Sequence, residues 1–129
     1  MFARTLACLL LCLVSFAALL PVHQAQARER APLVQQDIRL AQLPVEARET
    51  LQRIRSGASM PYAKDGTVFG NREGLLPRRP RGYYTEYTVP TPGSRDRGAR
   101  RIIAGGDPGR SGEYYYTSDH YRSFQQIRE

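Results

Sequence analysis

Residues 83–89 read Tyr-Tyr-Thr-Glu-Tyr-Thr-Val, an aromatic and β-branched run with a single charge, Glu86. This composition predicts a β-strand. Because side chains alternate across a strand, Glu86 is expected to share one face with Tyr84 and Thr88. The other face then carries Tyr83, Tyr87 and Val89. A carboxylate that faces a purely apolar core is costly, so we expect Glu86 on an open face near cationic side chains.

Further β-prone runs lie on both sides of this strand. Turn-forming segments with glycine, proline and aspartate separate them, at residues 64–66, 90–93 and 105–109. The runs are Thr67–Phe69, Arg101–Ala104, Tyr114–Thr117 and a final stretch that contains Phe124 and Ile127. Short strands joined by turns predict an antiparallel sheet.

A helix is predicted upstream of the strands, between Pro44 and Gly57. Proline suits the first position of a helix, and glycine suits its end. Ala47, Leu51 and Ile54 are spaced i, i+4 and i+7, so they lie on one face. The chain therefore predicts an α+β fold, in which one main N-terminal helix packs on a twisted antiparallel β-sheet.

The first 27 residues have the features of a secretory signal peptide. Arg4 supplies a basic start, residues 6–20 form an apolar run, and Ala25-Gln26-Ala27 places small residues at positions −3 and −1. A membrane anchor is the competing interpretation, but a bilayer needs roughly 20 apolar residues. We therefore expect cleavage after Ala27, a secreted product, and no membrane attachment after cleavage.

Removal of the signal changes the remaining chain. Both cysteines, Cys8 and Cys12, leave with it, so the secreted product is expected to have no disulfide, no thiol nucleophile and no cysteine-ligated zinc. Residues 28–39 are mixed and polar and are predicted to form a loose N-terminal arm, with disorder as an open alternative. Residues 40–129 are predicted to be the folded domain.

Positive charge is concentrated in one part of the chain. The formal net charge of +7 falls to +6 when Arg4 leaves with the signal. The segment from residue 78 to residue 101 contains Glu86 and Asp96 as its only acids. Its arginines are Arg78, Arg79, Arg81, Arg95, Arg97, Arg100 and Arg101. Guanidinium groups match phosphate oxygens, which favours a polyanion partner; a solvated basic face explains the charge alone equally well.

Three side chains together supply what RNA cleavage needs without a metal. Glu86 can take a proton from a ribose 2′-hydroxyl, His120 can protonate the departing 5′-oxygen, and Arg101 can stabilise charge on the phosphoryl oxygens. After the signal is removed, His120 is the only histidine. Because imidazole titrates near neutral pH, activity is expected to have a bell-shaped pH dependence. Antiparallel pairing can bring the three to one face, although a one-residue slip reverses every face.

Each of these residues also has an ordinary structural explanation. A lone histidine near a C-terminus is more often a structural or surface residue than a catalyst. Glu86 can simply pair with a cross-strand arginine, and Arg100 and Arg101 can be solvent-facing. The tyrosines at positions 114–116 suit sheet packing better than base stacking. No residue decides the question alone.

The order of four motifs favours the catalytic interpretation. They are Phe69–Pro77 (FGNREGLLP), residues 83–89 (YYTEYTV), Arg97–Ile103 (RGARRII) and Asp119-His120-Tyr121. In this order and spacing they resemble the secreted microbial guanyl-specific ribonucleases, the family of barnase and the streptomycete ribonucleases. The resemblance covers roughly residues 40–128 and implies the microbial ribonuclease fold.

The resemblance implies a role for each matched residue. Glu86 is cast as the general base and His120 as the general acid, while Arg97 and Arg101 bind the reacting phosphate. Tyr121 is similar to a tyrosine that helps to bind phosphate. The implied activity is an endoribonuclease that cleaves single-stranded RNA 3′ of guanosine through a 2′,3′-cyclic phosphate, with no metal and no cofactor.

The segment Phe69–Glu73 resembles the guanine-recognition loop of that family. The resemblance implies that the carboxylate of Glu73 accepts the N1 and N2 hydrogens of guanine, while backbone amides around Asn71 and Arg72 meet O6. A carboxylate can accept two parallel hydrogen bonds from guanine but not from adenine. An ion pair of Glu73 with Arg72 or another arginine is the alternative. Gly70 departs from the family, where a polar side chain is common.

The resemblance also implies a monomer, with a small acidic inhibitor of the barstar type as a partner that would cover the arginine-rich cleft. Two other functions stay open: a non-catalytic basic secreted protein that binds RNA, and the same ribonuclease used as an exported antibacterial toxin. Streptomycete relatives carry a disulfide that closes most of the domain. Its absence here is expected to remove a crosslink worth about 2–4 kcal/mol of stability.

Overall fold

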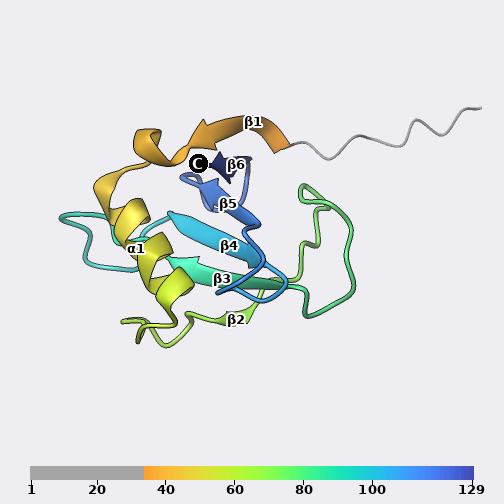
Figure 1. Ribbon diagram of the computed structural model, residues 1–129. Helices are drawn as coiled ribbons and strands as arrows, with labels where there is room; N and C mark the ends of the chain where they lie inside the picture. The colour runs from red at the N-terminus through yellow and green to blue at the C-terminus, as the bar shows by residue number, and fades with distance from the viewer. Residues whose placement is uncertain (1–33) are drawn as a thin grey trace, which may run out of the picture.

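The computed structural model describes residues 34–129 (Figure 1). The predicted signal peptide and residues 28–33 of the predicted arm lie outside the described residues. The elements are β1 (Val34–Arg39), the 3-10 helix η1 (Leu40–Gln42), α1 (Val45–Ser56), β2 (Thr67–Val68), β3 (Tyr84–Thr88), β4 (Arg101–Gly105), β5 (Tyr114–Thr117) and β6 (Phe124–Arg128). Within this part of the chain, no helix is both long and apolar enough to cross a membrane.

The helix α1 forms where the sequence predicts it. Pro44 occupies the capping position, one residue before the first helical residue, and Gly57 ends the helix with a φ of 67°. Glycine adopts this left-handed conformation without the steric cost of a side chain. Ala47, Leu51 and Ile54 are all buried on one face, as their spacing predicts.

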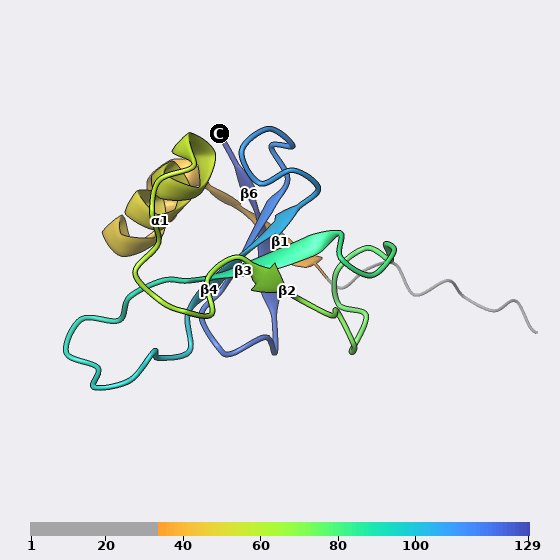
Figure 2. The ribbon, with the colours of Figure 1, turned by 90° about the horizontal axis from the view of Figure 1, so that it is seen from below.

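The strands form one six-stranded sheet in the order β1-β6-β5-β4-β3-β2. All neighbours pair antiparallel except β1 and β6, which run parallel. Figure 2 shows α1 lying along one face of the sheet, and no helix of residues 34–129 covers the other face. The predicted α+β fold is confirmed.

β1 differs from the sequence-based expectation. The predicted loose arm spans residues 28–39, yet residues 34–39 form a strand along β6. Ile38 packs against the core under the helix, and the Asp37 carboxylate accepts a hydrogen bond from Arg128 Nε at 3.0 Å. The pairing satisfies backbone groups at a sheet edge. The local sequence of this short polar strand does not indicate a strand, because the pairing depends on a distant segment of the chain, as in the contact of Asp37 with Arg128, 91 residues apart.

Side chains on the two faces of the sheet form separate hydrophobic clusters. The cluster under α1 includes Tyr87 and Val89. The opposite cluster consists of Leu76, Tyr84, Ile103, Tyr115 and Phe124. Tyr83 was expected beside Tyr87, but it packs against this second cluster because it precedes the first residue of β3. Its hydroxyl donates to the Glu113 carboxylate at 2.5 Å.

Candidate active site

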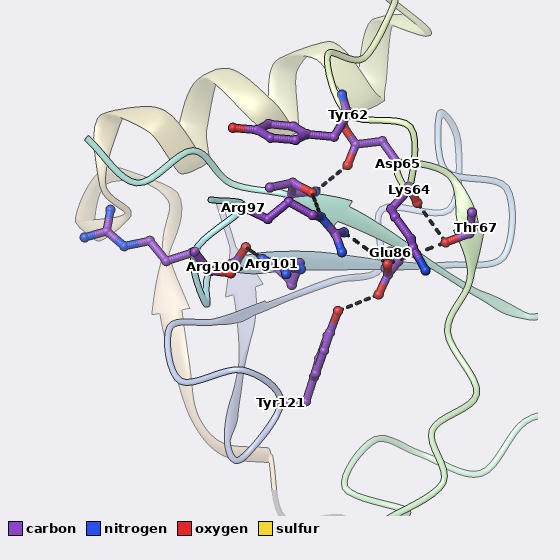
Figure 3. A network of polar contacts seen from close by, with 11 residues as sticks. Tyr62, Lys64, Asp65, Thr67, Glu86, Arg97, Arg100, Arg101 and Tyr121 are labelled. Carbon is purple, nitrogen blue, oxygen red and sulfur yellow. Dashed lines mark hydrogen bonds and ion pairs between the residues drawn. The ribbon is translucent and has the colours of Figure 1, made fainter. Parts of the chain in front are cut away.

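Glu86 lies in the middle of β3, on the sheet face opposite α1 (Figure 3). Its side chain is 13% exposed. Arg97 Nη2 donates to one carboxylate oxygen at 3.1 Å, and the Tyr121 hydroxyl donates to the other at 2.5 Å. Thr67 Oγ1 lies 3.5 Å from the first oxygen. The carboxylate is therefore held in one orientation on the open face, near a cation, as the sequence predicts.

Arg97 comes from the loop between β3 and β4. Its Nε donates to the hydroxyl of Thr88 at 2.9 Å, while its Nη2 reaches Glu86. The guanidinium is thus fixed along β3 by the two hydrogen bonds that it donates. Its contact with Glu86 is an ion pair in which neither side chain is more than 28% exposed.

A tight turn sets the position of Arg97. The carboxylate of Asp96 accepts hydrogen bonds from the Ser94 hydroxyl at 2.8 Å and from the Gly98 amide at 2.7 Å. The hydrogen bond from Ser94, followed by that from Gly98, holds the pKa of Asp96 below its ordinary value. Gly98 has a φ of 64°, and a Cβ there would lie 2.5 Å from Thr91 Oγ1. A side chain at this position would therefore disturb the turn.

Arg101 begins β4 opposite Thr88, on the same face as Glu86, and is only 2% exposed. Its Nη1 donates to the carbonyls of Gly98 at 2.9 Å and Arg100 at 2.7 Å. Its Nε is buried without a hydrogen-bond partner. None of the ion pairs within residues 34–129 includes this side chain. A buried cation that lacks a counter-ion is costly, so the site is suited to an anion.

His120 lies in the loop between β5 and β6, and its side chain is exposed. Its amide donates to the carbonyl of Ala99 at 3.1 Å, which ties the loop to the chain just before Arg101. The imidazole lies 4.8 Å from the ring of Tyr121, centroid to centroid. His120 thus lies beside Tyr121, whose hydroxyl donates to Glu86 and whose ring lies near the Arg101 guanidinium.

The backbone at His120 and Tyr121 is unusual. Their φ angles are 57° and 69°, a left-handed conformation that is uncommon for residues other than glycine. Such residues cost of order 1–3 kcal/mol each and persist where the surroundings hold them in place. The loop therefore needs a strong local anchor.

Asp119 is that anchor. Its carboxylate accepts hydrogen bonds from the hydroxyl of Thr117 at 2.9 Å, from the amides of Arg122 and Ser123 at 3.1 and 3.0 Å, and from the Ser123 hydroxyl at 2.6 Å. Burial acts to raise the pKa of Asp119, but the hydrogen bonds from Ser123, Thr117 and Arg122 outweigh it and lower the pKa below its ordinary value. The sequence motifs assign Asp119 no role of its own, although short polar residues around an aspartate are typical of such loops.

Tyr121 joins the two halves of the site. Its hydroxyl donates to Glu86, and its ring stacks on Phe69 with 5.1 Å between centroids. The guanidinium carbon of Arg101 lies 5.8 Å from the centre of the same ring. Burial, and next the hydrogen bond to Glu86, raise the pKa of Tyr121 to about 12. The phenol therefore remains a hydrogen-bond donor at neutral pH.

The segment Phe69–Glu73 follows β2 and lies beside Tyr121. The amide of Phe69 donates to the carbonyl of Tyr84 at 2.9 Å. Asn71 has a φ of 47°, and its side-chain amide closes the loop on Leu76, donating to its carbonyl at 3.0 Å and accepting from its amide at 3.1 Å. The Asn71 side chain is therefore engaged within the protein, which leaves backbone groups of the loop to meet a ligand.

The charged residues of this loop are solvent-exposed. Neither Arg72 nor Glu73 takes part in an ion pair within residues 34–129. The alternative interpretation, that Glu73 pairs with Arg72, is therefore not supported by a contact. The structure brings together Glu86, Arg97, Arg101, His120 and Tyr121, and it leaves Glu73 on a separate loop.

The chemistry of this site rests on a carboxylate, an imidazole and two guanidinium groups. Within residues 34–129, no group of three or more histidine, cysteine, aspartate or glutamate side chains could hold a metal ion. A carboxylate and an imidazole can exchange protons with a bound molecule, and the guanidinium groups can hold an anion between them.

The sequence is similar to those of known ribonucleases. Residues 26–128 match the family model described as ribonuclease. The chain is 54% identical over 90 residues to guanyl-specific ribonuclease St of Saccharopolyspora erythraea, covering 70% of this chain and 85% of that protein. It is 53% identical over 88 residues to guanyl-specific ribonuclease Sa of Kitasatospora aureofaciens, covering 68% and 88%.

The fold is also similar to that of solved structures. A structure of ribonuclease Sa2 complexes with mononucleotides matches with a TM-score of 0.69 and 47% identity, over 73% of this chain and 94% of that one. A crystal structure of ribonuclease Sa2 with guanosine-2′-cyclophosphate matches with a TM-score of 0.66 and 46% identity, over 72% and 96%.

Proposed function

The chain belongs to the guanyl-specific ribonuclease family and is a guanyl-specific endoribonuclease, and on this premise we propose the mechanism by which it acts. It cleaves single-stranded RNA on the 3′ side of guanosine by transesterification that uses no metal. Glu86 is the general base and His120 is the general acid. Arg97 and Arg101 stabilise the reacting phosphate.

The observation that carries this proposal is the state of Arg101. Its guanidinium is buried, its Nε has no partner, and no carboxylate within residues 34–129 pairs with it. His120 lies beside Tyr121, whose hydroxyl donates to Glu86. A phosphate beside Arg101 would supply the counter-ion that this buried guanidinium lacks. It would then lie between Glu86 as proton acceptor and His120 as proton donor.

In the first step, Glu86 removes the proton of the guanosine 2′-hydroxyl. The oxygen attacks the adjacent phosphorus, the bond from phosphorus to the 5′-oxygen breaks, and His120 gives its proton to that oxygen. Charge that gathers on the phosphoryl oxygens is stabilised by Arg97 and Arg101. The products are a 2′,3′-cyclic phosphate and a free 5′-hydroxyl. DNA lacks the 2′-hydroxyl and is not a substrate for this route.

The contacts of Glu86 support its role as base. Hydrogen bonds from Arg97 and Tyr121 hold the carboxylate in one orientation on the open face of the sheet. Because Tyr121 also stacks on Phe69, it connects the general base Glu86 to the loop that we assign to guanine binding.

We assign guanine to the Phe69–Glu73 loop. The exposed carboxylate of Glu73 accepts the N1 and N2 hydrogens of the base, and backbone amides near Asn71 and Arg72 donate to O6. The relative ribonuclease Sa2 has been crystallised with guanosine-2′-cyclophosphate, a ligand of the chemistry that this loop and the phosphate site would bind together. Side-chain selection of guanine by one carboxylate agrees with the donor pattern of that base.

We also propose that the protein acts outside the cell as a monomer, after export and cleavage behind Ala27, which the signal-like features of residues 1–27 support. The exposed arginines would also suit a small acidic inhibitor protein that covers the site.

The experiment that tests this function is product mapping in excess chelator. Protein purified from the culture medium is incubated with an RNA of defined sequence, alongside H120A. Cuts after guanosine that leave a 2′,3′-cyclic phosphate, and that H120A makes at least about 100-fold more slowly, support the mechanism. Cleavage that the chelator abolishes, or that H120A leaves unchanged, contradicts it.

A further inference from the structure

The loop Pro77–Gly82, with the sequence Pro-Arg-Arg-Pro-Arg-Gly, carries three arginines that the mechanism does not use. It connects the proposed guanine loop to β3, so it lies next to the proposed base site in the chain. All three arginines are exposed. A short loop with this charge, directly after the base site, requires its own explanation.

A hollow of about 470 Å³ lies where this loop meets the guanine loop. It is lined by Gly70, Asn71, Arg72, Gly74, Leu76, Arg78 and Arg79. Gly70 has no side chain to fill the hollow, and a Cβ there would meet only the side chain of Arg72, at 3.5 Å. The hollow therefore combines open space with guanidinium groups from both loops.

The arginine loop is fixed to the sheet at two points. The Tyr84 hydroxyl donates to the carbonyl of Pro77 at 2.6 Å. The guanidinium of Arg79 lies over the ring of Tyr83, 5.1 Å from its centre. Proline at two of its six positions limits the backbone further. A loop held in this way loses less conformational entropy when a ligand binds.

The arginines of the hollow differ from Arg97 and Arg100 in their partners. Arg97 and Arg100 each pair with a carboxylate. Among the ion pairs of residues 34–129, none includes Arg72, Arg78 or Arg79. Three guanidinium groups around a hollow, without carboxylates to neutralise them, favour an anionic ligand such as a phosphate.

The position of the hollow indicates which phosphate would bind. The arginine loop precedes Tyr84 at the start of β3, and the loop that carries Arg97 follows Thr88 at its end, so the two lie at opposite ends of the strand (Figure 1). In the proposed mechanism the phosphate on the 3′ side of guanosine lies between Glu86 and His120. RNA that continues past the guanine loop toward the arginines is then the part on the 5′ side.

We propose that Arg78 and Arg79, with Arg72 at the edge of the hollow, bind the phosphate backbone of the nucleotides that precede the guanosine. This inference rests on the proposed function and extends it, since it makes the enzyme prefer guanosines inside a longer strand. The contacts are to phosphate, so they add affinity without a preference for the upstream base.

Three substrates with one guanosine each separate the possibilities. They are the dinucleotide GpA, the 5′-extended AAAAGA and the 3′-extended GAAAAA. The exported protein is compared with R78Q/R79Q and with R48Q/R53Q, which removes two exposed arginines from α1 on the opposite face of the sheet. Thermal unfolding of each variant checks that the fold is retained.

We expect R78Q/R79Q to lower kcat/KM about 3- to 20-fold on AAAAGA, through KM, and less than about 2-fold on the other two substrates. The salt dependence of log kcat/KM on AAAAGA should become shallower by about 1.4, since each lost phosphate contact on a single strand removes about 0.7. The control R48Q/R53Q should match the wild type on all three substrates.

Equal losses on all three substrates, a loss confined to GAAAAA, no loss, or an equal effect of R48Q/R53Q would each overturn the inference. If the wild-type protein cleaves none of the three substrates, the result contradicts the proposed function itself. If the wild type cleaves after guanosine and R78Q/R79Q behaves identically, the result contradicts only the inference about the hollow.

Discussion

The catalytic end of the sheet and the guanine loop are built in different ways. Arg101 is 2% exposed and the Glu86 side chain 13% exposed, and both are held by hydrogen bonds to neighbouring elements. Arg72 and Glu73 are exposed, and their loop is closed by the side chain of Asn71. Glu86 and Arg101 are thus fixed on the sheet, whereas the proposed selection of guanine depends on a surface loop. Changes at the two places should have separable consequences.

The largest effect is expected at Arg101. R101M should lower kcat about 100- to 1,000-fold, because a buried donor to the phosphate is removed. The free energy of unfolding should fall by no more than about 1 kcal/mol, because methionine removes a buried cation that has no carboxylate partner within residues 34–129. Steady-state kinetics and urea unfolding measure the two quantities. Activity within threefold of the wild type would contradict the phosphate role.

An intermediate effect is expected at Glu73. E73Q should lower kcat/KM on GpA about 100-fold, since one acceptor of two hydrogen bonds from guanine becomes a partial donor. Stability should not change, because the side chain is exposed. E49Q, at an exposed position of α1, controls for the loss of charge. If E73Q and E49Q cleave GpA equally well, Glu73 does not select guanine.

A smaller effect is expected at Asp119, which holds the loop that presents His120. D119N keeps the shape of the side chain but weakens its hydrogen bonds, so kcat should fall about 3- to 10-fold. D37N, which removes an exposed carboxylate from β1, should leave kcat unchanged. A loss of stability in D119N without any loss of kcat would show that Asp119 serves the fold alone.

The same variant has a defined dependence on pH. The pKa of Asp119 is lower in the folded state than its ordinary value of about 3.9. Ionised Asp119 therefore stabilises the protein above that pH, and the contribution is lost as the pH falls through the folded pKa. The difference in unfolding free energy between the wild type and D119N should be largest near neutral pH and should shrink below about pH 4. A difference that grows on acidification would contradict the hydrogen-bond network.

Most of the fold could be predicted from the sequence because its signals are local. The periodic face of α1 and the β-prone runs between glycine and proline turns locate the helix and four of the strands to within a residue, and they indicate the place of β6 without its bounds. β1 could not be predicted, because it is stabilised by a parallel partner at the other end of the chain. Tyr83 was assigned to the wrong face because alternation was extended one residue beyond the start of β3.

The candidate site was predicted in its composition but not in its geometry. Residue types and motif order make Glu86, Arg101 and His120 the candidates, and the register that places Glu86 and Arg101 on one face follows from pairing that no single strand encodes. The left-handed backbone at His120 and Tyr121 depends on hydrogen bonds to Asp119, a tertiary feature of the loop. The contacts within the site therefore required the structure.

The central claim, that His120 protonates the leaving oxygen and Glu86 is the base, can be tested with a substrate in which sulfur replaces the 5′-oxygen after guanosine. A thiolate leaves without protonation, so an enzyme that lacks its general acid should still cleave this substrate. We predict that H120A cleaves the sulfur substrate within about tenfold of the wild-type rate while remaining at least about 100-fold slower on normal RNA, and that E86Q is slow on both. Equal impairment of H120A on the two substrates, or rescue of E86Q by sulfur, would contradict this assignment of acid and base.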